Sequence, residues 1–252
     1  MEIELNDIKF KLSTDKINGI YTNNIDKTTK LLKLDNENTK VNKKVLSKQD
    51  LYNYKKSIYI IDEYLDNNDN KTIYDLLLNT ILEYNIYPRN INKKIKDAVK
   101  IVGLKEEVLT LGIKDISSSE KKLIQLAISL LLNSNIIVLI EPFKILDLNN
   151  RKRIIILLQK LIDKYKKNII IITEDVEVLL KYTKYLVIIK NNKLVKQGDT
   201  FKLLSDVELL KKHHIDVPEI IEITYLVKKN KNVKIDYFID IRDIIKDIYK
   251  HV

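Results

Sequence analysis

The sequence of 252 residues contains no cysteine, and it has only four glycines and three prolines. The lack of cysteine excludes a disulfide framework and thiolate chemistry, which agrees with a cytoplasmic protein. No apolar run approaches the ~20 residues that a membrane-spanning helix needs. The acidic start, Met1–Glu4, lacks the cationic and apolar segments of a secretion signal. We therefore expect a soluble chain that reaches a membrane only through a partner.

Arginine is also scarce, since only four of the 45 basic residues are arginine although the formal net charge is +10. Arginine is the residue expected at phosphate forks and at the edges of nucleic-acid bases. The lysines accompany abundant asparagine and isoleucine, a bias typical of AT-rich codons and solvated faces. We therefore expect no direct nucleic-acid partner, and a salt-dependent affinity for DNA or RNA would contradict this.

Short buried strands alternate with helical segments, which predicts an α/β fold with a parallel sheet. The segment Ile136–Ile140 is apolar at every position, as in a strand covered on both faces. Glu141 follows it, at the end of the strand where open α/β sheets bind ligands. The other predicted strands are Ile17–Thr22, Ser57–Ile61, Ile169–Thr173 and Leu186–Lys190.

The helices between these strands are predicted from periodicity and caps. Glu120–Asn133 is expected to be a largely buried helix, and Asn149–Lys166 an amphipathic helix capped by Asn149 or Asn150. Residues 66–71 form a polar loop, and residues 72–115 are predicted to be mostly helical. A tight hairpin turn is expected at Asn191-Asn192.

The pattern changes after about residue 205. Ser205 and Glu208 have the spacing of a capping box for a short helix. Pro218 suits the first turn of the next helix, and Asp240 is placed to cap a last helix, Ile241–His251.

Residues 19–32 read GIYTNNIDKTTKLL, a degenerate form of the phosphate-binding pattern G-x-x-x-x-G-K-[ST]. With Lys27 as the phosphate lysine, Thr28 takes the magnesium-side hydroxyl position. Tyr21 and Asp26 then replace the glycines that let backbone N–H groups converge on an anion. By itself, a lysine and two threonines at a helix start indicate only a solvated first turn.

Further segments match in order and spacing, and together they resemble the ABC-transporter ATPases. Residues 136–147 resemble the Walker B strand and D-loop, with Ile140 at the metal-associated aspartate. The other matching segments are Asp62 at the Q-loop, Ser117–Glu120 at the signature and Thr173–Asp175 at the switch histidine. The resemblance implies a P-loop NTPase core of the ABC ATPase type, with a mostly parallel sheet, a helical subdomain and a small C-terminal extension.

The tail resembles a narrower group, the energy-coupling-factor (cobalt and vitamin importer) ATPases. Residues 201–220, FKLLSDVELLKKHHIDVPEI, match the start of that group's C-terminal extension. The resemblance implies an ATP-binding domain over residues 1–205, a helical subdomain over about 72–132, and an extension over 206–252 that contacts another subunit. The chain begins at what resembles the family's second strand, Ile8–Leu12, so we expect the strand with the adenine-stacking aromatic to be missing.

The family implies a role for each matching residue. Those on the nucleotide side are Asn24, Asp26, Lys27, Thr28 (also the weak metal position), Thr29 and Asp62. Those at the catalytic carboxylate and switch positions are Glu141 and Glu174. Those offered to a partner's site are Ser117, Ser118, Ser119 and Glu120 of the signature and Asp147 of the D-loop.

The substitutions affect the residues on the nucleotide side more than the residues offered to a partner's site. Asp26 and Glu174 place negative charge near the expected phosphates, and Ile140 supplies no oxygen for Mg²⁺. Ser117 retains the signature serine at a helix start, a natural anion site. Each retained residue also has a structural interpretation: Ser117 as a capping-box residue and Glu141 as a cap of the strand end.

The resemblance implies ATP and Mg²⁺ as cofactors, a second ABC ATPase subunit (a paralogue or a second copy) and a membrane-embedded coupling protein. It places the chain in the cytoplasm, on the inner face of the cell membrane through these partners. The preferred hypothesis is a degenerate subunit that donates signature and D-loop residues to a partner's ATP site. A weakly active ATPase and a non-catalytic scaffold or regulatory module remain alternatives, and the transported solute is not encoded here.

Overall fold

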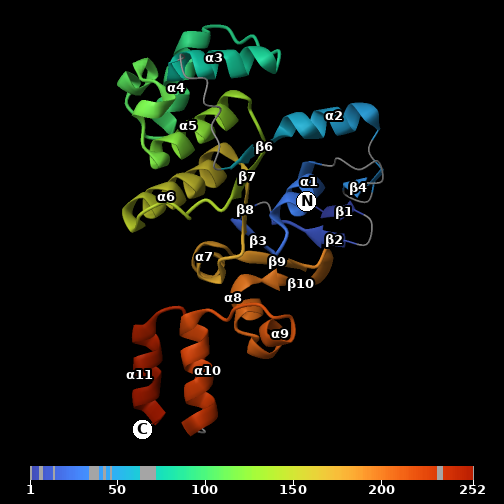
Figure 1. Cartoon of the computed structure of the whole chain (residues 1–252), viewed down its shortest axis with the longest axis vertical. Helices are drawn as coiled ribbons and strands as arrows, with labels where there is room; N and C mark the ends of the chain where they lie inside the picture. The colour runs from blue at the N-terminus through green and yellow to red at the C-terminus, as the bar shows by residue number, and fades with distance from the viewer. Residues whose placement is uncertain are drawn as a thin grey trace. The chain divides into compact units, whose positions relative to one another are not determined.

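The computed structural model describes residues 2–5, 8–13, 15–33, 40–41, 44–45, 47–62, 72–231 and 235–251 (Figure 1). The polar loop expected at residues 66–71 lies outside the described residues. The chain divides into two compact units. The terminal unit comprises Met1–Val45 and Ile171–Val252, and the central unit comprises Leu46–Ile170.

Six strands form a mostly parallel sheet in the order β10-β9-β3-β8-β7-β6. The strands are β3 (Asn18–Thr22), β6 (Ile58–Ile61), β7 (Ile136–Ile140), β8 (Asn168–Thr173), β9 (Tyr185–Lys190) and β10 (Lys193–Asp199). β3 pairs with β9 and β6 with β7 in parallel, whereas β10 is antiparallel to β9. The predicted α/β fold and the five predicted strands are therefore confirmed.

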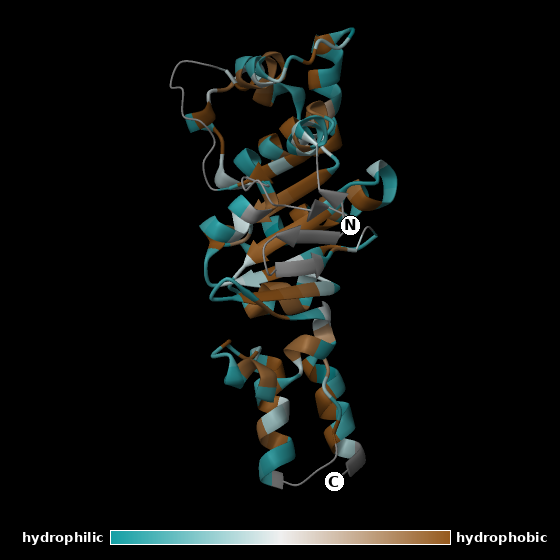
Figure 2. Ribbon diagram, turned by 90° about the vertical axis from the view of Figure 1, so that its right-hand side faces the viewer, coloured by the Kyte–Doolittle hydropathy of each residue, from teal (hydrophilic) through white to brown (hydrophobic). Residues whose placement is uncertain are grey.

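The strands β6, β7, β8 and β9 are rich in isoleucine, leucine and valine, and brown strands are visible in Figure 2. Every residue of β3 is buried, and so are Ile136–Leu139 of β7 and Ile169–Thr173 of β8. β9 turns into β10 through Asn191 and Asn192, with φ of 51° and 61°. Both values lie in the left-handed region that a two-residue hairpin turn requires, so the predicted turn is confirmed.

A second sheet of four strands, in the order β2-β1-β4-β5, belongs to the terminal unit. Its strands are β1 (Glu2–Leu5), β2 (Ile8–Lys11), β4 (Lys40–Val41) and β5 (Lys44–Val45). β1 runs antiparallel to β2, with Leu5 opposite Ile8. The expectation that the chain begins at the Ile8–Leu12 strand was therefore wrong. The short alternation Glu-Ile-Glu-Leu is a strand pattern in its own right, although it contains no aromatic residue.

The central unit is largely helical outside its strands. Its helices are α2 (Lys48–Ser57), α3 (Ile73–Glu83), α4 (Ile91–Ile101), α5 (Ser118–Leu131) and α6 (Leu148–Tyr165), with 3-10 turns at Glu106–Thr110 and Ile113–Asp115. The prediction of mostly helical structure over residues 72–115 is confirmed. So is the buried helix, because α5 is buried at every position from Leu123 to Ser129.

The predicted cap of α6 was wrong. Asp147 is the N-cap residue, and its carboxylate accepts the backbone N–H groups of Asn149 at 2.8 Å and Asn150 at 2.9 Å. The Asn150 side chain also donates to it, at 2.6 Å. These hydrogen bonds, above all those from Asn150, hold the pKa of Asp147 below its usual value.

The helices of the terminal unit are α1 (Ile25–Lys33), α7 (Val176–Tyr182), α8 (Thr200–Leu204), α9 (Val207–Lys212), α10 (Glu219–Lys231) and α11 (Ile241–His251). Asp206 caps α9 by accepting the Leu209 N–H, so the cap predicted at Ser205 was wrong. Pro218 lies one position before α10, just outside the first turn predicted for it, and its carbonyl accepts the Glu222 N–H. Asp240 caps α11 as predicted, accepting the Arg242 N–H at 2.9 Å.

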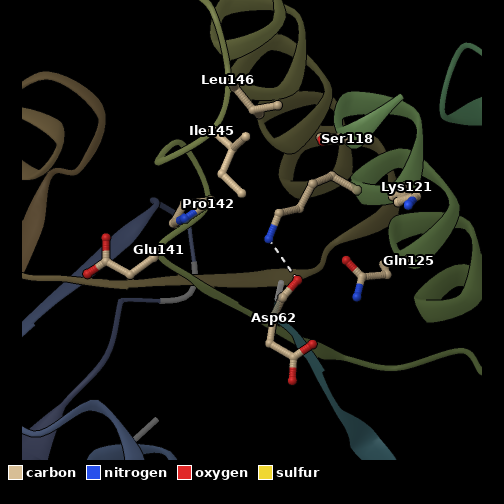
Figure 3. A pocket seen from close by; sticks show the side chains of 9 residues that line it. Asp62, Ser118, Lys121, Gln125, Glu141, Pro142, Ile145 and Leu146 are labelled. Atoms are coloured by element: carbon tan, nitrogen blue, oxygen red, sulfur yellow. Dashed lines mark hydrogen bonds between the residues drawn. The ribbon is translucent and has the colours of Figure 1, made fainter. Parts of the chain in front are cut away.

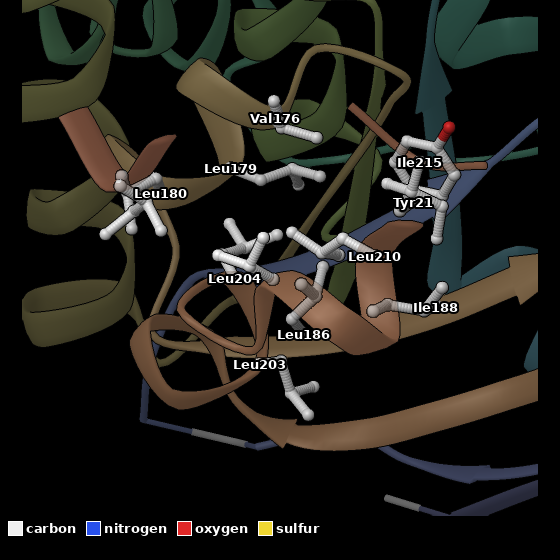
Figure 4. Packing of buried hydrophobic residues seen from close by; sticks show 12 residues of the cluster. Tyr21, Val176, Leu179, Leu180, Leu186, Ile188, Leu203, Leu204, Leu210 and Ile215 are labelled. Atoms are coloured by element: carbon white, nitrogen blue, oxygen red, sulfur yellow. The ribbon is translucent and has the colours of Figure 1, made fainter. Parts of the chain in front are cut away.

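A buried cluster connects α7, α8, α9 and α10 to β3 and β9 within the terminal unit (Figure 4). Leu186 and Ile188 come from β9, Leu179 from α7, and Leu210 and Ile215 from α9 and the segment after it. All five side chains are less than 5% exposed. Their burial attaches α9 and the segment after it to β9 and α7. Among the described residues, none of the helices combines the length and the apolar character that crossing a bilayer requires.

We expect Asp147→Ala to lower the thermal unfolding midpoint by about 2–4 °C, because two N–H groups at the start of α6 lose their acceptor. Asn149→Ala is the matched control, since its side chain was the predicted cap and the structure assigns that role to Asp147. A drop for Asn149→Ala that equals the drop for Asp147→Ala would contradict the cap assignment.

Candidate functional site

The turn between β3 and α1 contains only Asn23 and Asn24, because the strand runs to Thr22 and the helix begins at Ile25. Its polar groups bond to one another. Asn24 N–H donates to Thr22 Oγ1 at 3.1 Å, Lys27 N–H to Asn24 Oδ1 at 2.9 Å, and Thr28 N–H to Asn24 O at 3.0 Å. These are the kind of groups that a phosphate loop leaves pointing at its anion. In this chain the N–H groups of Asn24, Lys27 and Thr28 already have acceptors within the segment.

Thr28 is the residue expected on the magnesium side, and it is only 2% exposed. Its hydroxyl donates to Thr22 Oγ1 at 2.8 Å, so it fastens the helix to the strand. Asp26 and Lys27 are exposed on the first turn of α1, and Thr29 is half-buried after them. The hydroxyl expected on the magnesium side is therefore buried and hydrogen-bonded within the protein.

Tyr21 stands at the first glycine position and belongs to the buried cluster of the terminal unit, where it is 7% exposed. Figure 4 shows its ring beside Ile215. Burial raises the pKa of the Tyr21 phenol, and the charges of Glu174 and Asp216 raise it further. Glu174, at the switch position, lies on the exposed segment between β8 and α7.

The start of α5 is held by a complete capping box. Glu120 N–H donates to Ser117 Oγ at 3.3 Å, and Ser117 N–H donates to Glu120 Oε2 at 2.8 Å. The Ser117 hydroxyl also donates to Glu120 Oε2 at 2.8 Å and lies 3.0 Å from Ser119 Oγ. The hydrogen bonds that Glu120 accepts from the Ser117 N–H and from the Ser117 hydroxyl lower the pKa of the Glu120 carboxyl. Ser118 and Ser119 occupy the first helical positions, where N–H groups have no acceptor within the helix.

A pocket of about 110 Å³ in the central unit brings three of the predicted residues together: Asp62, Ser118 and Glu141 (Figure 3). Asp62 and Glu141 follow the paired strands β6 and β7, while Ser118 begins α5. The remaining lining residues are Lys121, Lys122, Gln125, Pro142, Ile145 and Leu146. Glu141 has φ of 41°, a left-handed conformation that stores strain in a residue other than glycine.

Sequence reasoning missed two residues that organise these sites. Thr22 accepts the Thr28 hydroxyl and fixes the β3–α1 turn. The Lys122 ammonium donates a hydrogen bond to the backbone oxygen of Asp62 at 2.8 Å, which connects the predicted Q-loop position to α5. Neither contact can be predicted from the residues that surround it in the sequence. Lys122 does lie close after the signature segment, and that position was the one available indication of a role for it.

The predicted residues fall into two groups. Asn24, Asp26, Lys27, Thr28, Thr29 and Glu174 belong to the terminal unit. Asp62, Ser117, Ser118, Ser119, Glu120, Glu141 and Asp147 belong to the central unit. In the part of the chain that the structure describes, no cluster of three or more histidine, aspartate or glutamate side chains is arranged to hold a metal ion.

No protein-family model matches this chain. It is 29% identical over 148 residues to the energy-coupling factor transporter ATP-binding protein EcfA2 of Mycoplasma capricolum, which covers 56% of this chain and 51% of that protein. The protein of the same name from Mycoplasmopsis synoviae is 30% identical over 169 residues, 64% of this chain and 54% of that protein. The chain therefore spans about half the length of these relatives.

Solved structures show the same fold. The cbiO1 protein of Clostridium perfringens, described as part of the ABC transporter complex cbiONQ, superposes with a TM-score of 0.69 at 19% identity, over 86% of this chain and 90% of that one. A dimeric ATP-binding cassette in a post-hydrolysis state, bound to ADP and Pi, gives 0.60 at 16% identity, over 77% and 89%. This chain has the fold of an ABC ATPase cassette and resembles, in sequence, the ATP-binding proteins of energy-coupling-factor transporters.

Proposed function

We propose that this chain is an ATP-binding-cassette subunit of an energy-coupling-factor importer. In this proposal its own nucleotide site is impaired, and it donates signature and D-loop residues to the ATP site of a partner. The observation that carries the first half is the β3–α1 turn, whose N–H groups and Thr28 hydroxyl are engaged within the turn. A phosphate loop has to present such groups to the anion, and here they would first have to break these bonds.

Charge supports the same conclusion with less weight. Asp26 precedes Lys27 on the exposed first turn of α1. Two unit charges ~4 Å apart interact by about 1 kcal/mol in water and about 4 kcal/mol at an effective dielectric of 20. The smaller value applies at an exposed position, so Asp26 weakens an anion site without abolishing it. Ile140 matters more, because Mg²⁺ takes oxygen ligands and an isoleucine has none.

The geometry of the signature segment, Ser117–Glu120, supports the proposal that it is donated to a partner's ATP site. Ser117 and Glu120 fix the start of α5, and a fixed helix start presents its first N–H groups, here those of Ser118 and Ser119, to a ligand. The Glu120 carboxylate already accepts from Ser117, so its negative charge is partly compensated. Asp147 belongs to the same central unit and is held in place by its own N-cap bonds.

The proposal assigns the partners by chemistry. A second cassette, either a paralogue or another copy, supplies the phosphate loop and the metal ligands that hold ATP and Mg²⁺. A membrane-embedded coupling protein takes up the resulting movement, which places this chain on the inner face of the cell membrane. The fold of the solved cassettes and the names of the relatives support this assignment.

A weakly active ATPase is the second candidate, and Glu141 favours it. Glu141 is among the residues that line the pocket at the end of β7, and its backbone has a positive φ, although Figure 3 shows its carboxylate turned away from the other lining side chains. Strained backbone concentrates at functional sites, which is a reason to test activity directly.

We expect the isolated chain to hydrolyse no Mg-ATP above the buffer rate and Lys27→Ala to leave Mg-ATP binding unchanged. The reason is that Lys27 lies beside a closed turn. Calorimetric titration and a phosphate-release assay measure the two quantities. Micromolar Mg-ATP affinity that is lost in Lys27→Ala would contradict the proposal and establish the second candidate.

In a complex with an intact cassette, we expect Ser117→Arg to reduce ATP hydrolysis at least tenfold, because the long side chain blocks the donated helix start. Ser47→Arg is the matched control. Ser47 is also an exposed N-cap serine of the central unit, with the same contact to the residue three positions on, Asp50. Both variants lose a cap, but only one lies on the proposed donated surface. Equal activity of the two complexes would rule out donation.

A further inference from the structure

A second and larger cavity of the central unit is lined by α4, by the ends of α5 and α6, and by the segment before α4. Its volume is about 520 Å³, within the range of small-molecule sites. Most of its lining is apolar, and its polar lining consists of Lys94, Asp97, Asn133 and Lys167. The apolar lining residues are Ile86, Ala98, Ile101, Leu130, Leu131 and Tyr165. None of the residues proposed above for nucleotide chemistry is among them.

Lys167 is the unusual member of this lining, because it is only 5% exposed. Lysine is almost never buried without a partner. Among the described residues, the Lys167 ammonium donates its hydrogen bond to Asn133 Oδ1 at 3.3 Å, which is a long bond to a neutral acceptor. Burial lowers the pKa of Lys167, as expected for an ammonium whose hydrogen-bond partner among the described residues is a neutral amide.

The position of Lys167 is set by the backbone. Lys166 ends α6 in a left-handed conformation with φ of 54°, and Lys167 N–H then donates to Leu161 O. Asn133 ends α5 in the same way, with φ of 54°. Two helix ends therefore bring Lys167 and Asn133 to one wall of the cavity and hold them there.

We propose that this cavity binds a small monocarboxylate with a short hydrocarbon body, whose carboxylate pairs with the Lys167 ammonium. The apolar lining suits the hydrocarbon, and a buried cation with a single neutral partner suits an anion. Lys94, Lys167 and Asp97 together leave one formal positive charge in the lining. One net charge matches a monoanion, and the Asp97 carboxylate opposes a dianion such as phosphate.

The probe for this proposal is octanoate, titrated calorimetrically into the full chain at neutral pH. We expect octanoate to bind at least tenfold more tightly than octanol, which has the same chain length and no charge. In Lys167→Met the preference for octanoate is lost, because methionine keeps the length of the side chain and removes its charge. Acetate and inorganic phosphate are expected to bind at least tenfold more weakly than octanoate.

Lys164→Met is the control, since Lys164 is an exposed lysine in the last turn of α6. It is expected to bind octanoate as the unmodified chain does. Lys167→Met removes a poorly compensated buried charge, so its unfolding midpoint should not fall, which separates loss of binding from loss of fold.

Each other outcome overturns the proposal. Equal affinities for octanoate and octanol show a cavity that does not use its charge. An octanoate preference that survives in Lys167→Met places the anion elsewhere. Acetate as tight as octanoate, or phosphate tighter than octanoate, assigns a different ligand class. These results do not depend on whether the chain binds ATP.

Discussion

Burial of the inner strands of the six-stranded sheet is the constraint on which the rest of this structure depends. The residues of β3, and of β8 from Ile169 onward, are all buried, so a polar side chain on these strands needs a hydrogen-bond partner inside the protein, as the Asn18 amide has by donating to Ser13 O. Most polar side chains of the candidate sites lie instead at the turns where strands end, and there they either bond locally or line a cavity. The chemistry open to the protein therefore depends on whether the polar groups at each strand end bond to one another or line a cavity.

Two of these ends show the two outcomes. At the end of β3, Thr22, Asn24 and Thr28 bond to one another and the turn closes. At the end of β7, Glu141 keeps a strained backbone beside a small pocket. The fold of a nucleotide-binding cassette is preserved in both places, but only the second retains a residue in a conformation that local stability does not favour.

Much of the fold could be predicted from the sequence because its signals are local. Apolar runs such as Ile136–Ile140 predict buried strands, and the pattern before Asn133 predicts a buried helix. The α6 cap was misplaced because Asp147, Asn149 and Asn150 are all good capping residues, and backbone register chooses between them. The strand at Glu2–Leu5 was missed because the family layout was given more weight than its own short alternation.

The sites were less predictable, for a physical reason. The spacing of the motifs in the sequence identified Lys27, Thr28 and Glu141 as candidate site residues. It did not predict which atoms these residues contact. Lys122 reaches Asp62 across 60 positions of the chain, and no local pattern encodes such a contact. The buried Lys167 was also invisible, because a lysine in a lysine-rich sequence carries no sign that it faces inward.

Tyr21 has a packing role that a glycine at the same position could not fill. Its ring fills space in the cluster that includes Leu210 and Ile215, so the C-terminal helices now rely on a side chain where a phosphate loop needs none. Glycine at this position would leave a cavity in a packed core, at a cost of about 3 kcal/mol or more. Position 21 is therefore tied to the attachment of the C-terminal helices, and a substitution that opens space there also loosens those helices.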